Sequence, residues 1–212
     1  MELQETVKKE NRTLAIFGGT FDPPHLGHLA IAEQVLANDL AGEVMFVPAA
    51  KPPHKLDKQI TSGKHRLEML EILIKDKPGF SISDYEIVNK MKNSYTIHTL
   101  RAMKTVFHNK KIALIVGMDN FLDFDTWFKF EEIIENYQLI VFTRPGYRKA
   151  PMGEIVEKFG HRKAEQLANS IIEINYDVSS TEIRNLAEER KDFSKYVTEE
   201  VMYYINENKL YG

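Results

Sequence analysis

The sequence predicts an α/β fold, in which helices cover both faces of a doubly wound, mainly parallel sheet and a small helical part closes the chain. Three observations favour this class. Short apolar runs that suit buried strands alternate with amphipathic segments of helical length. A pair of glycines directly follows the first apolar run, and no Ser/Gly-rich linker divides the chain. We therefore expect one domain over residues 13–212, with a helical subregion at about 178–212 and a flexible N-terminus at 1–12.

The first predicted unit is a strand, a helix and a second strand. Leu14–Phe17 is apolar and suits a central strand, and Gly18-Gly19 is expected to let the backbone turn sharply and approach a ligand. A helix is expected to begin near His25 and run to Ala37, and Val44–Val47 is the next strand. Parallel strands joined this way form a right-handed crossover.

The later elements follow the same alternation. We expect Thr61 or Ser62 to cap the helix that runs through Leu73, and Ser94 or Thr96 to cap the helix Ile97–Phe107. Four more strands are predicted, at Phe80–Asp84, Lys111–Val116, Gln138–Phe142 and Ile171–Ile174, and an edge hairpin or extended excursion is predicted at Tyr85–Lys92. Helices are predicted at Glu131–Asn136, at Met152–Ala168 with a break at Gly160, after Val178, and at Thr198–Asn208. The last of these helices is expected to cover the sheet.

Composition excludes several classes of protein. The chain has 212 residues, a net charge of -3 and no cysteine, so disulfides and thiolate catalysis are excluded. The slight negative charge argues against a nucleic-acid partner held by general electrostatics. Residues 1–12 lack the apolar core of a signal peptide, and no apolar run reaches membrane-spanning length. These features favour a cytoplasmic protein without a membrane partner.

Two histidines mark the start of the first helix. His25 and His28 stand three residues apart, so both imidazoles are expected on one face of the first helical turn. Unpaired amide groups and the helix dipole favour an anion at that end of a helix. Either histidine alone is more often a cap or a surface residue. As a pair after a strand and a glycine turn, they predict a phosphate site.

Further candidates lie where predicted strands end. The loop after the second strand carries Lys51, His54 and Lys55, and this end of a parallel sheet is where α/β proteins bind ligands. A solvated basic loop is the alternative. Asp119 follows the strand Lys111–Val116, where it suits either a turn or a bond to ribose hydroxyls.

Two more candidates come later in the chain. Trp127, the only tryptophan, lies near Phe121, Phe124 and Phe128. Aromatic residues at such spacing are usually core, but one facing a crevice offers a stacking surface for a planar ring. Arg184 stands one turn into a helix that follows several hydroxyl residues, where a guanidinium can bind phosphate through bidentate hydrogen bonds.

The glycine turn followed by His25-Leu26-Gly27-His28 resembles the nucleotidyltransferase superfamily, whose mark is His-x-Gly-His. Motifs from Leu14 to about Tyr204 narrow the resemblance to the family of bacterial nicotinate mononucleotide adenylyltransferases, which have a Rossmann-like fold. These motifs are Gly18–His28, Pro52-Pro53-His54-Lys55, Ser94-Tyr95-Thr96, Gly117-Met118-Asp119 with Trp127, Arg144-Pro145-Gly146 and Ser179–Arg184. One departure is His98, where the family often has Asp.

The resemblance implies a reaction and a set of site residues. The phosphate of nicotinate mononucleotide would attack the α-phosphorus of ATP, with Mg²⁺ carried mainly by the triphosphate and no metal site of the protein's own. It implies that His25, His28 and Arg184 are catalytic, that ATP is bound by Gly18, Gly19, Thr20, Phe21, His25, His28, Gly117, Asp119, Ser180, Thr181 and Arg184, and that the mononucleotide is bound by Lys51, His54, Lys55, Tyr95, Thr96, Asp119, Trp127 and Arg144.

Other functions stay open on the sequence alone. The acceptor could instead be nicotinamide mononucleotide or phosphopantetheine, and a cytidylyltransferase or a fragment of a class I aminoacyl-tRNA synthetase shares the histidine motif. A non-catalytic nucleotide sensor could use the same fold. A homo-oligomer is compatible with the sequence, which does not determine it.

Overall fold

A parallel six-stranded sheet forms the centre of the molecule in this computed structural model, which describes residues 13–51, 60–91, 93–143, 152–168, 170–174, 176 and 178–212. Its order is β3-β2-β1-β4-β5-β6, and each neighbouring pair is parallel. The strands are β1 Thr13–Gly19, β2 Glu43–Pro48, β3 Phe80–Ile82, β4 Lys111–Gly117, β5 Gln138–Thr143 and β6 Ile171–Glu173. The predicted fold class and all six predicted strands are confirmed, while the predicted N-terminal segment at 1–12 lies outside the described residues.

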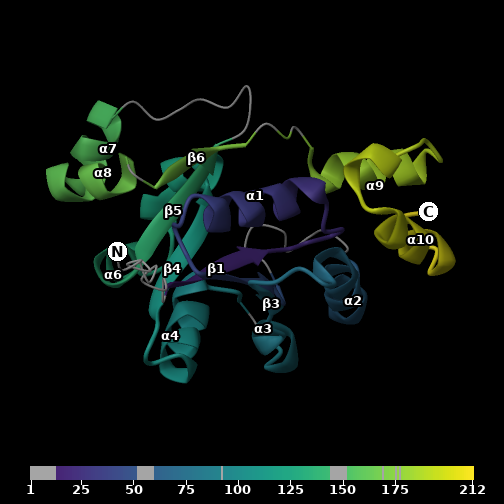
Figure 1. Cartoon of the computed structure of the whole chain (residues 1–212), viewed down its shortest axis with the longest axis horizontal. Helices are drawn as coiled ribbons and strands as arrows, with labels where there is room; N and C mark the ends of the chain where they lie inside the picture. Colours follow the sequence, from purple (N-terminus) through teal and green to yellow (C-terminus); the bar gives the residue numbers. More distant parts are fainter. Residues whose placement is uncertain are drawn as a thin grey trace, which may run out of the picture.

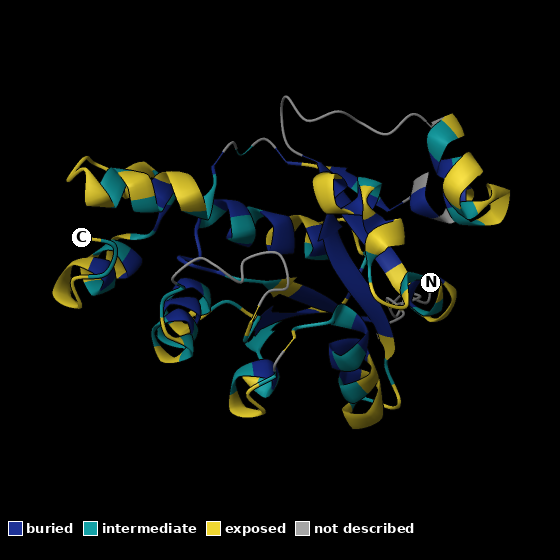
Figure 2. Cartoon of the chain, turned by 180° about the vertical axis from the view of Figure 1, so that it is seen from behind, coloured by how far each residue is buried: buried dark blue, intermediate teal, exposed yellow. Residues whose placement is uncertain are grey.

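Alternation along β1 explains why helices cover both faces of the sheet. Leu14 and Ile16 belong to one buried cluster, whereas Ala15 and Phe17 belong to another on the opposite face. The first cluster includes residues of the helix α4, and the second includes residues of α1. Figure 1 shows α1 above the sheet and α4 below it, and Figure 2 shows the central strands as mostly buried.

The helices begin close to their predicted starts. Ser62, Ser179 and Thr198 each accept a backbone N–H from three residues ahead, as expected of N-caps. Gly160, at a φ of 77°, separates two helices as predicted. The helices are α1 Leu26–Ala37, α2 Gly63–Ile74, α3 Tyr85–Val88, α4 Thr96–Val106, α5 Met118–Leu122, α6 Phe130–Asn136, α7 Met152–Phe159, α8 His161–Ala168, α9 Ser180–Glu188 and α10 Glu199–Glu207, with 3₁₀ turns η2 Phe124–Thr126 and η3 Ser194–Tyr196.

The prediction of a hairpin or extended segment at Tyr85–Lys92 was wrong, because the chain forms the short helix α3 there. This turn brings Glu86 into the interior, where it is 5% exposed. Its carboxylate accepts hydrogen bonds from the Thr99 hydroxyl at 2.5 Å and from the backbone N–H of Ala50 at 3.3 Å. A buried carboxylate needs such partners, so contacts distant in sequence decide the local conformation.

The expected cap of α4 was also wrong. The N-cap position is Tyr95, whose side chain makes no capping bond, and Thr96 is already the first helical residue. The Ser94 hydroxyl instead accepts the backbone N–H of Lys51 at 3.0 Å, and the backbone N–H of Ser94 donates to the carbonyl of Lys51 at 3.2 Å. The loops after β2 and before α4 are thereby joined.

The two glycines after the first apolar run do not form the turn that we predicted. Gly18 and Gly19 continue β1 and pair with Val47 and Pro48 of β2. The sharp change of direction comes later, at Phe21, which has a φ of 50°. A Cβ on Gly19 would lie 2.9 Å from the Phe21 ring, so this glycine makes room for the ring rather than for the turn.

The helices α2, α9 and α10 form a third buried cluster at one end of the molecule. Met69 and Leu73 of α2 pack with Ile183 of α9 and with Val201 and Ile205 of α10. The helix α10 therefore packs on α2, and the prediction that it covers the sheet was wrong.

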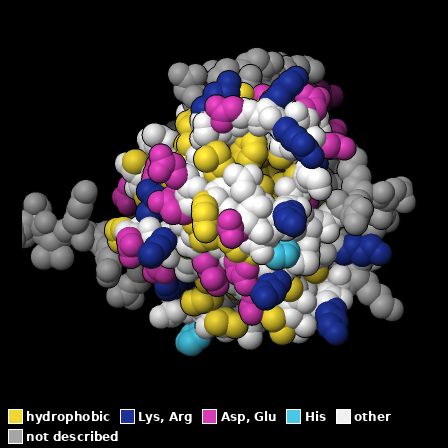
Figure 3. Space-filling model, turned by 90° about the vertical axis from the view of Figure 1, so that its right-hand side faces the viewer, with side chains coloured by type: hydrophobic (Ala, Val, Ile, Leu, Met, Phe, Trp, Pro, Cys, Tyr) yellow, Lys and Arg dark blue, Asp and Glu magenta, His cyan; other side chains and the backbone are white. Residues whose placement is uncertain are grey.

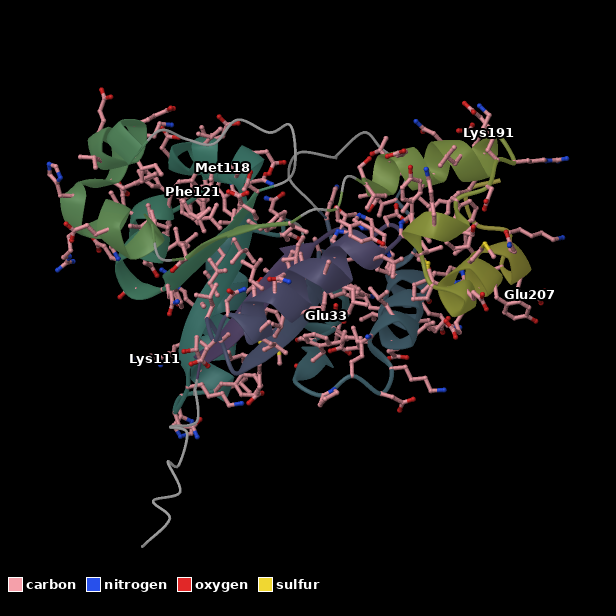
Figure 4. The ribbon with its side chains drawn as sticks, turned by 45° about the horizontal axis from the view of Figure 1, so that its top comes forward. Glu33, Lys111, Met118, Phe121, Lys191 and Glu207 are labelled. Carbon is pink, nitrogen blue, oxygen red and sulfur yellow. The ribbon has the colours of Figure 1, made fainter. Side chains whose placement is uncertain are left out.

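The surface at this end of the molecule carries charges of both signs (Figure 3). In Figure 4, Lys191 and Glu207 project from it, whereas Met118 and Phe121 lie together in the interior near α7 and α8. Within the described ranges, no helix has the length and apolar character needed to cross a bilayer.

Candidate active site

A cavity of about 470 Å³ opens where strands β1, β2, β4 and β5 end. The chain leaves β1 toward β2 and β3 and returns on the other side of β1 with β4, so the direction of winding reverses here. Ligands bind at such a point in open α/β sheets. The cavity is lined by Phe17, Gly18, Gly19, Thr20, Phe21, His25, His28, Ala49, Ser94, Tyr95, Thr96, Asn120, Thr126, Trp127, Phe128, Phe142, Ser179, Ser180 and Thr181.

The two histidines of the first helix lie on one face, as predicted. Their rings stack with centroids 3.7 Å apart, and His25 is buried at the N-cap of α1. The backbone N–H of His25 donates to Nδ1 of His28 at 3.2 Å. Because Nδ1 of His28 is thereby an acceptor, the neutral ring carries its proton on Nε2. His28 is thus oriented as a hydrogen-bond donor through Nε2.

The N-terminus of α9 closes the same side of the cavity. Ser179 caps the helix, and the hydroxyl of Ser180 donates to the carbonyl oxygen of Pro23 at 2.9 Å. A Cβ on Gly27 would lie 3.0 Å from both the His25 ring and the Val178 side chain, so only glycine allows the two helix starts to come this close. Two helix N-termini therefore face one cavity, which favours an anionic ligand.

Aromatic side chains line the opposite side. Trp127 is half-buried and packs on Phe124, with ring centroids 4.8 Å apart. The next residue, Phe128, is 46% exposed and packs against Tyr95 at 4.9 Å. Phe121 and Phe124 are buried core residues, as the spacing suggested, but Phe128 is not. Planar rings at the cavity surface suit a planar ligand.

A buried arginine fixes the walls of the cavity from behind. Arg66, 2% exposed, donates to the carbonyl oxygens of Thr20 at 2.8 Å, Ala49 at 2.9 Å and Thr61 at 2.9 Å. Burial lowers the pKa of its guanidinium, which the negative charge of Asp22 opposes. Arg66 thus has a structural role, since its side chain joins three segments of backbone behind the cavity.

Most of the predicted site residues meet at this cavity. Those that line it are Gly18, Gly19, Thr20, Phe21, His25, His28, Tyr95, Thr96, Trp127, Ser180 and Thr181. Three others, His54, Lys55 and Arg144, lie outside the described residues. Their roles stay predictions.

Four predicted residues do not line the cavity, namely Lys51, Gly117, Asp119 and Arg184. Lys51 is exposed and uses its backbone to bond Ser94. Asp119 is exposed in the first turn of α5, and its carboxylate lies over Gly117, where a Cβ would be 2.4 Å from Oδ1. Arg184 donates to the carbonyl oxygen of Asp22 at 2.6 Å and to the Thr181 hydroxyl at 3.2 Å. In this structure Arg184 thus holds the loop before α1.

Sequence reasoning overlooked several residues of the cavity. Asn120 and Thr126 each stand next to a predicted site residue, but nothing in the sequence distinguishes them from other polar surface residues. Phe128 was grouped with core aromatics, although its place directly beside Trp127 was a usable signal. Phe17, Ala49 and Phe142 reach the cavity only because neighbouring strands end together.

The described residues contain no group of three or more His, Asp or Glu side chains that could hold a metal ion. The site chemistry visible in this part of the chain comes from imidazoles, hydroxyls, helix N-termini and aromatic rings.

Known proteins resemble the chain over most of its length. The family model described as cytidylyltransferase-like matches residues 16–186. The chain is 35% identical over 199 residues to a probable nicotinate-nucleotide adenylyltransferase of Symbiobacterium thermophilum, covering 93% of this chain and 94% of that one. It is 38% identical over 199 residues to the protein of the same description in Caldicellulosiruptor bescii, covering 93% and 98%.

Solved structures show the same fold. A nicotinic acid mononucleotide adenylyltransferase of Plasmodium falciparum, described as complexed with NaAD, matches with a TM-score of 0.75 at 20% identity, over 94% of this chain and 97% of that one. A putative nicotinate-nucleotide adenylyltransferase of Vibrio parahaemolyticus matches with a TM-score of 0.66 at 24% identity, over 94% and 95%.

Proposed function

The chain belongs to the cytidylyltransferase-like family and to its nicotinate-nucleotide adenylyltransferase members, and we propose that it transfers the adenylyl group of ATP to nicotinate mononucleotide. The products are nicotinate adenine dinucleotide and pyrophosphate, in the biosynthesis of NAD. One observation carries the proposal beyond homology. A single cavity joins two helix N-termini, which suit phosphates, to an exposed aromatic surface, which suits a pyridine or adenine ring.

The reaction needs positioning more than it needs a base. An oxygen of the mononucleotide phosphate forms a bond to the α-phosphorus of ATP, and the bond from that phosphorus to the bridging oxygen breaks, releasing pyrophosphate. A phosphate monoester has a second pKa of about 6, so the nucleophile is already mostly dianionic near neutral pH. The protein therefore contributes orientation and positive potential.

We assign the charge stabilisation to the α1 side of the cavity. His28 presents Nε2–H as a donor, and its orientation is fixed by the bond from the His25 backbone to Nδ1. The stacked His25 ring holds the plane of His28 in place. A donor fixed before the substrate arrives needs no reorganisation as charge develops on the phosphate oxygens.

We assign binding of the rest of the triphosphate to the α9 side of the cavity. Ser180 and Thr181 lie at the start of α9 and line the cavity. Arg184 remains assigned to ATP, although in this structure it bonds the carbonyl of Asp22. The guanidinium would have to exchange that carbonyl for a phosphate oxygen.

The aromatic side is assigned to the pyridine ring. Tyr95 and Thr96 lie at the start of α4 beside Trp127, and all three line the cavity. Fluorescence of Trp127 should be quenched when nicotinate mononucleotide binds, because the pyridine ring is expected to pack against the indole. Trp127 is the only tryptophan of the chain, so the emission reports on this site alone. Unchanged emission at saturation, with binding measured separately by calorimetry, would contradict this assignment.

We propose that Mg²⁺ reaches the site with ATP. The donors that the described residues bring to the cavity are imidazoles and hydroxyls rather than a set of carboxylates, which fits a metal held mainly by triphosphate oxygens and water. When bound, Mg²⁺ supplies partial neutralisation of the triphosphate charge.

Pyrophosphate release from ATP tests the function directly. The wild-type protein is given nicotinate mononucleotide, nicotinamide mononucleotide or phosphopantetheine, each with ATP and Mg²⁺. The proposal predicts the highest kcat/KM with the nicotinate compound. Preference for either other acceptor would reassign the enzyme, and binding of ATP without turnover on any of them would indicate a sensor.

Three further expectations belong to the proposal. We expect a cytoplasmic enzyme, because ATP and pyridine nucleotides are its substrates. We expect no nucleic-acid partner, given a net charge of -3. Residues 13–212 are expected to fold as one domain.

A further inference from the structure

A buried carboxylate lies in the loop that connects β1 to the histidine helix. Asp22 is 3% exposed and sits between Phe21, which lines the cavity, and Pro23. Its Oδ2 accepts the backbone N–H of Thr61 at 3.3 Å. Its Oδ1 accepts the hydroxyl of Tyr211 at 2.6 Å, across 189 positions of sequence. Neither Asp22 nor Tyr211 has a role in the proposed reaction described above.

The Tyr211 hydroxyl is held as a donor. Burial raises the pKa of this phenol, and the negative charge of Asp22 raises it further. The phenol therefore stays protonated at neutral pH, and its proton is directed at Asp22. A short bond from a neutral donor to a carboxylate is a charge-assisted bond, which is stronger than a bond between two neutral groups.

The Asp22 loop determines where the first phosphate-binding helix begins. Two other side chains hold the same loop by its carbonyl groups, because Arg184 bonds Asp22 and Ser180 bonds Pro23. The Phe21 ring packs edge-on against the His28 ring, with centroids 4.9 Å apart. A shift of Asp22 therefore moves the wall against which His28 is placed.

Among the described side chains that hold this loop, those of Arg66 and Tyr211 are not candidates for ATP contact, and Tyr211 is the one that bonds the Asp22 carboxylate. Ser180 lines the cavity, and Arg184 is assigned to the triphosphate. Loss of either would alter binding directly. Tyr211 does not line the cavity, so its effect on the substrate is indirect, and its hydrogen bond to Asp22 is the contact that reaches the loop.

From these contacts we propose that Tyr211 is a positioning residue for adenylyl transfer. Its bond to Asp22 sets the geometry of the Phe21–Pro23 loop and thereby the fit of the triphosphate beside His28. The inference rests on the proposed function for its kinetic consequences. Its effect on ATP binding does not depend on the acceptor.

The test compares Tyr211→Phe with Tyr203→Phe, which removes the same hydroxyl from a tyrosine that is 67% exposed on α10. Thermal unfolding, ATP affinity by calorimetry without acceptor, and the kinetic constants with nicotinate mononucleotide are measured for each. For Tyr211→Phe we expect the Kd and KM for ATP to rise about fivefold and kcat to fall by a similar factor. The KM for the mononucleotide should stay within about twofold, as should every constant of Tyr203→Phe.

This pattern separates positioning from simple support of the fold. A purely structural role would lower the fraction of active enzyme, which reduces apparent kcat but changes neither KM. ATP affinity within twofold of wild type in a folded Tyr211→Phe protein would overturn the inference. Equal weakening by Tyr203→Phe would overturn it as well.

A second variant keeps the test decisive if Tyr211→Phe fails to fold or if the proposed function is wrong. Asp22→Asn keeps an acceptor oxygen but removes the charge, and it is measured in the same way, alone and with Tyr211→Phe. We expect the two changes to be non-additive in ATP affinity, because they break one interaction. Strict additivity would overturn the inference. If wild-type protein gave no pyrophosphate with any acceptor, the proposed function would fail, while the ATP affinities would still decide the role of Tyr211.

Discussion

Replacing Arg66 by methionine should destabilise the protein more than any surface change of the same kind. The variant keeps the apolar stem of the side chain but removes the donors to the carbonyls of Thr20, Ala49 and Thr61. Each hydrogen bond from a charged donor contributes about 1.5–3 kcal/mol, and bonds that share one side chain are not additive. Loss of one member of a buried charged network costs about 3–5 kcal/mol, because the remaining groups are left buried without partners.

We therefore expect a loss of about 4 kcal/mol in the free energy of unfolding for Arg66→Met. For a chain of this size, each kcal/mol corresponds to about 2–4 °C in Tm, so Tm should fall by about 8–16 °C. Urea unfolding followed by far-ultraviolet circular dichroism gives the free energy, and differential scanning fluorimetry gives Tm. Arg66→Lys should recover only part of the loss, because one ammonium group cannot reproduce the guanidinium fork.

Arg101→Met provides the matched control. Arg101 donates two hydrogen bonds to Glu132, at 2.7 and 2.5 Å, but the pair lies on the surface. Exposed ion pairs contribute little to stability, so the unfolding midpoint of this variant should stay near that of wild type. A loss below about 1 kcal/mol for Arg66→Met, or equal shifts in both variants, would refute the reasoning from burial.

Three further predictions concern the cavity and one titrating group. His28→Ala should lower kcat at least about tenfold with the fold intact, because a preorganised donor to the phosphate is lost. His108 is exposed, so His108→Ala should leave kcat unchanged. Equal turnover in the two variants would remove the role of His28. Phe128→Ala should raise the KM for nicotinate mononucleotide about fivefold and leave the KM for ATP unchanged, with Val88→Ala, 64% exposed, as control; a rise in the KM for ATP alone would place the ring elsewhere. Burial raises the pKa of Tyr204 from 10 to about 12. The protonated phenol therefore contributes fully to stability below pH 10, and this contribution is lost as pH rises through 12. The urea midpoint should fall more steeply across that range in wild type than in Tyr204→Phe, and parallel curves for the two proteins would contradict this prediction.

The candidate site was predictable where a local pattern carries the chemistry. His25 and His28 come together because an N-cap residue and the third residue of its helix are neighbours in a capping box, and in the structure their rings stack. Ser179 could be recognised as an N-cap, because capping depends on nearest neighbours. Gly18 and Gly19 were found for the wrong reason, since β2 holds them in the sheet and the turn falls at Phe21.

Other residues escaped prediction because their environment is made by distant parts of the chain. Its position next to Trp127 is the one local signal that sets Phe128 apart from Phe124, and only the fold places Phe128 at the cavity surface and Phe124 in the core. Glu86 imposed a helical turn on a segment expected to be extended, because its partners Thr99 and Ala50 lie elsewhere.

The sequence by itself determined the six strands, the longer helices between them, the parallel character of the sheet and the start of the histidine helix. These properties follow from hydrophobic periodicity and from capping, which act over a few residues. Only the tertiary structure decided that Arg184 and Tyr211 hold the Asp22 loop, and that Arg66 joins the ends of β1 and β2. A buried polar group must find its partners wherever the fold brings them, so these contacts have no signature along the chain.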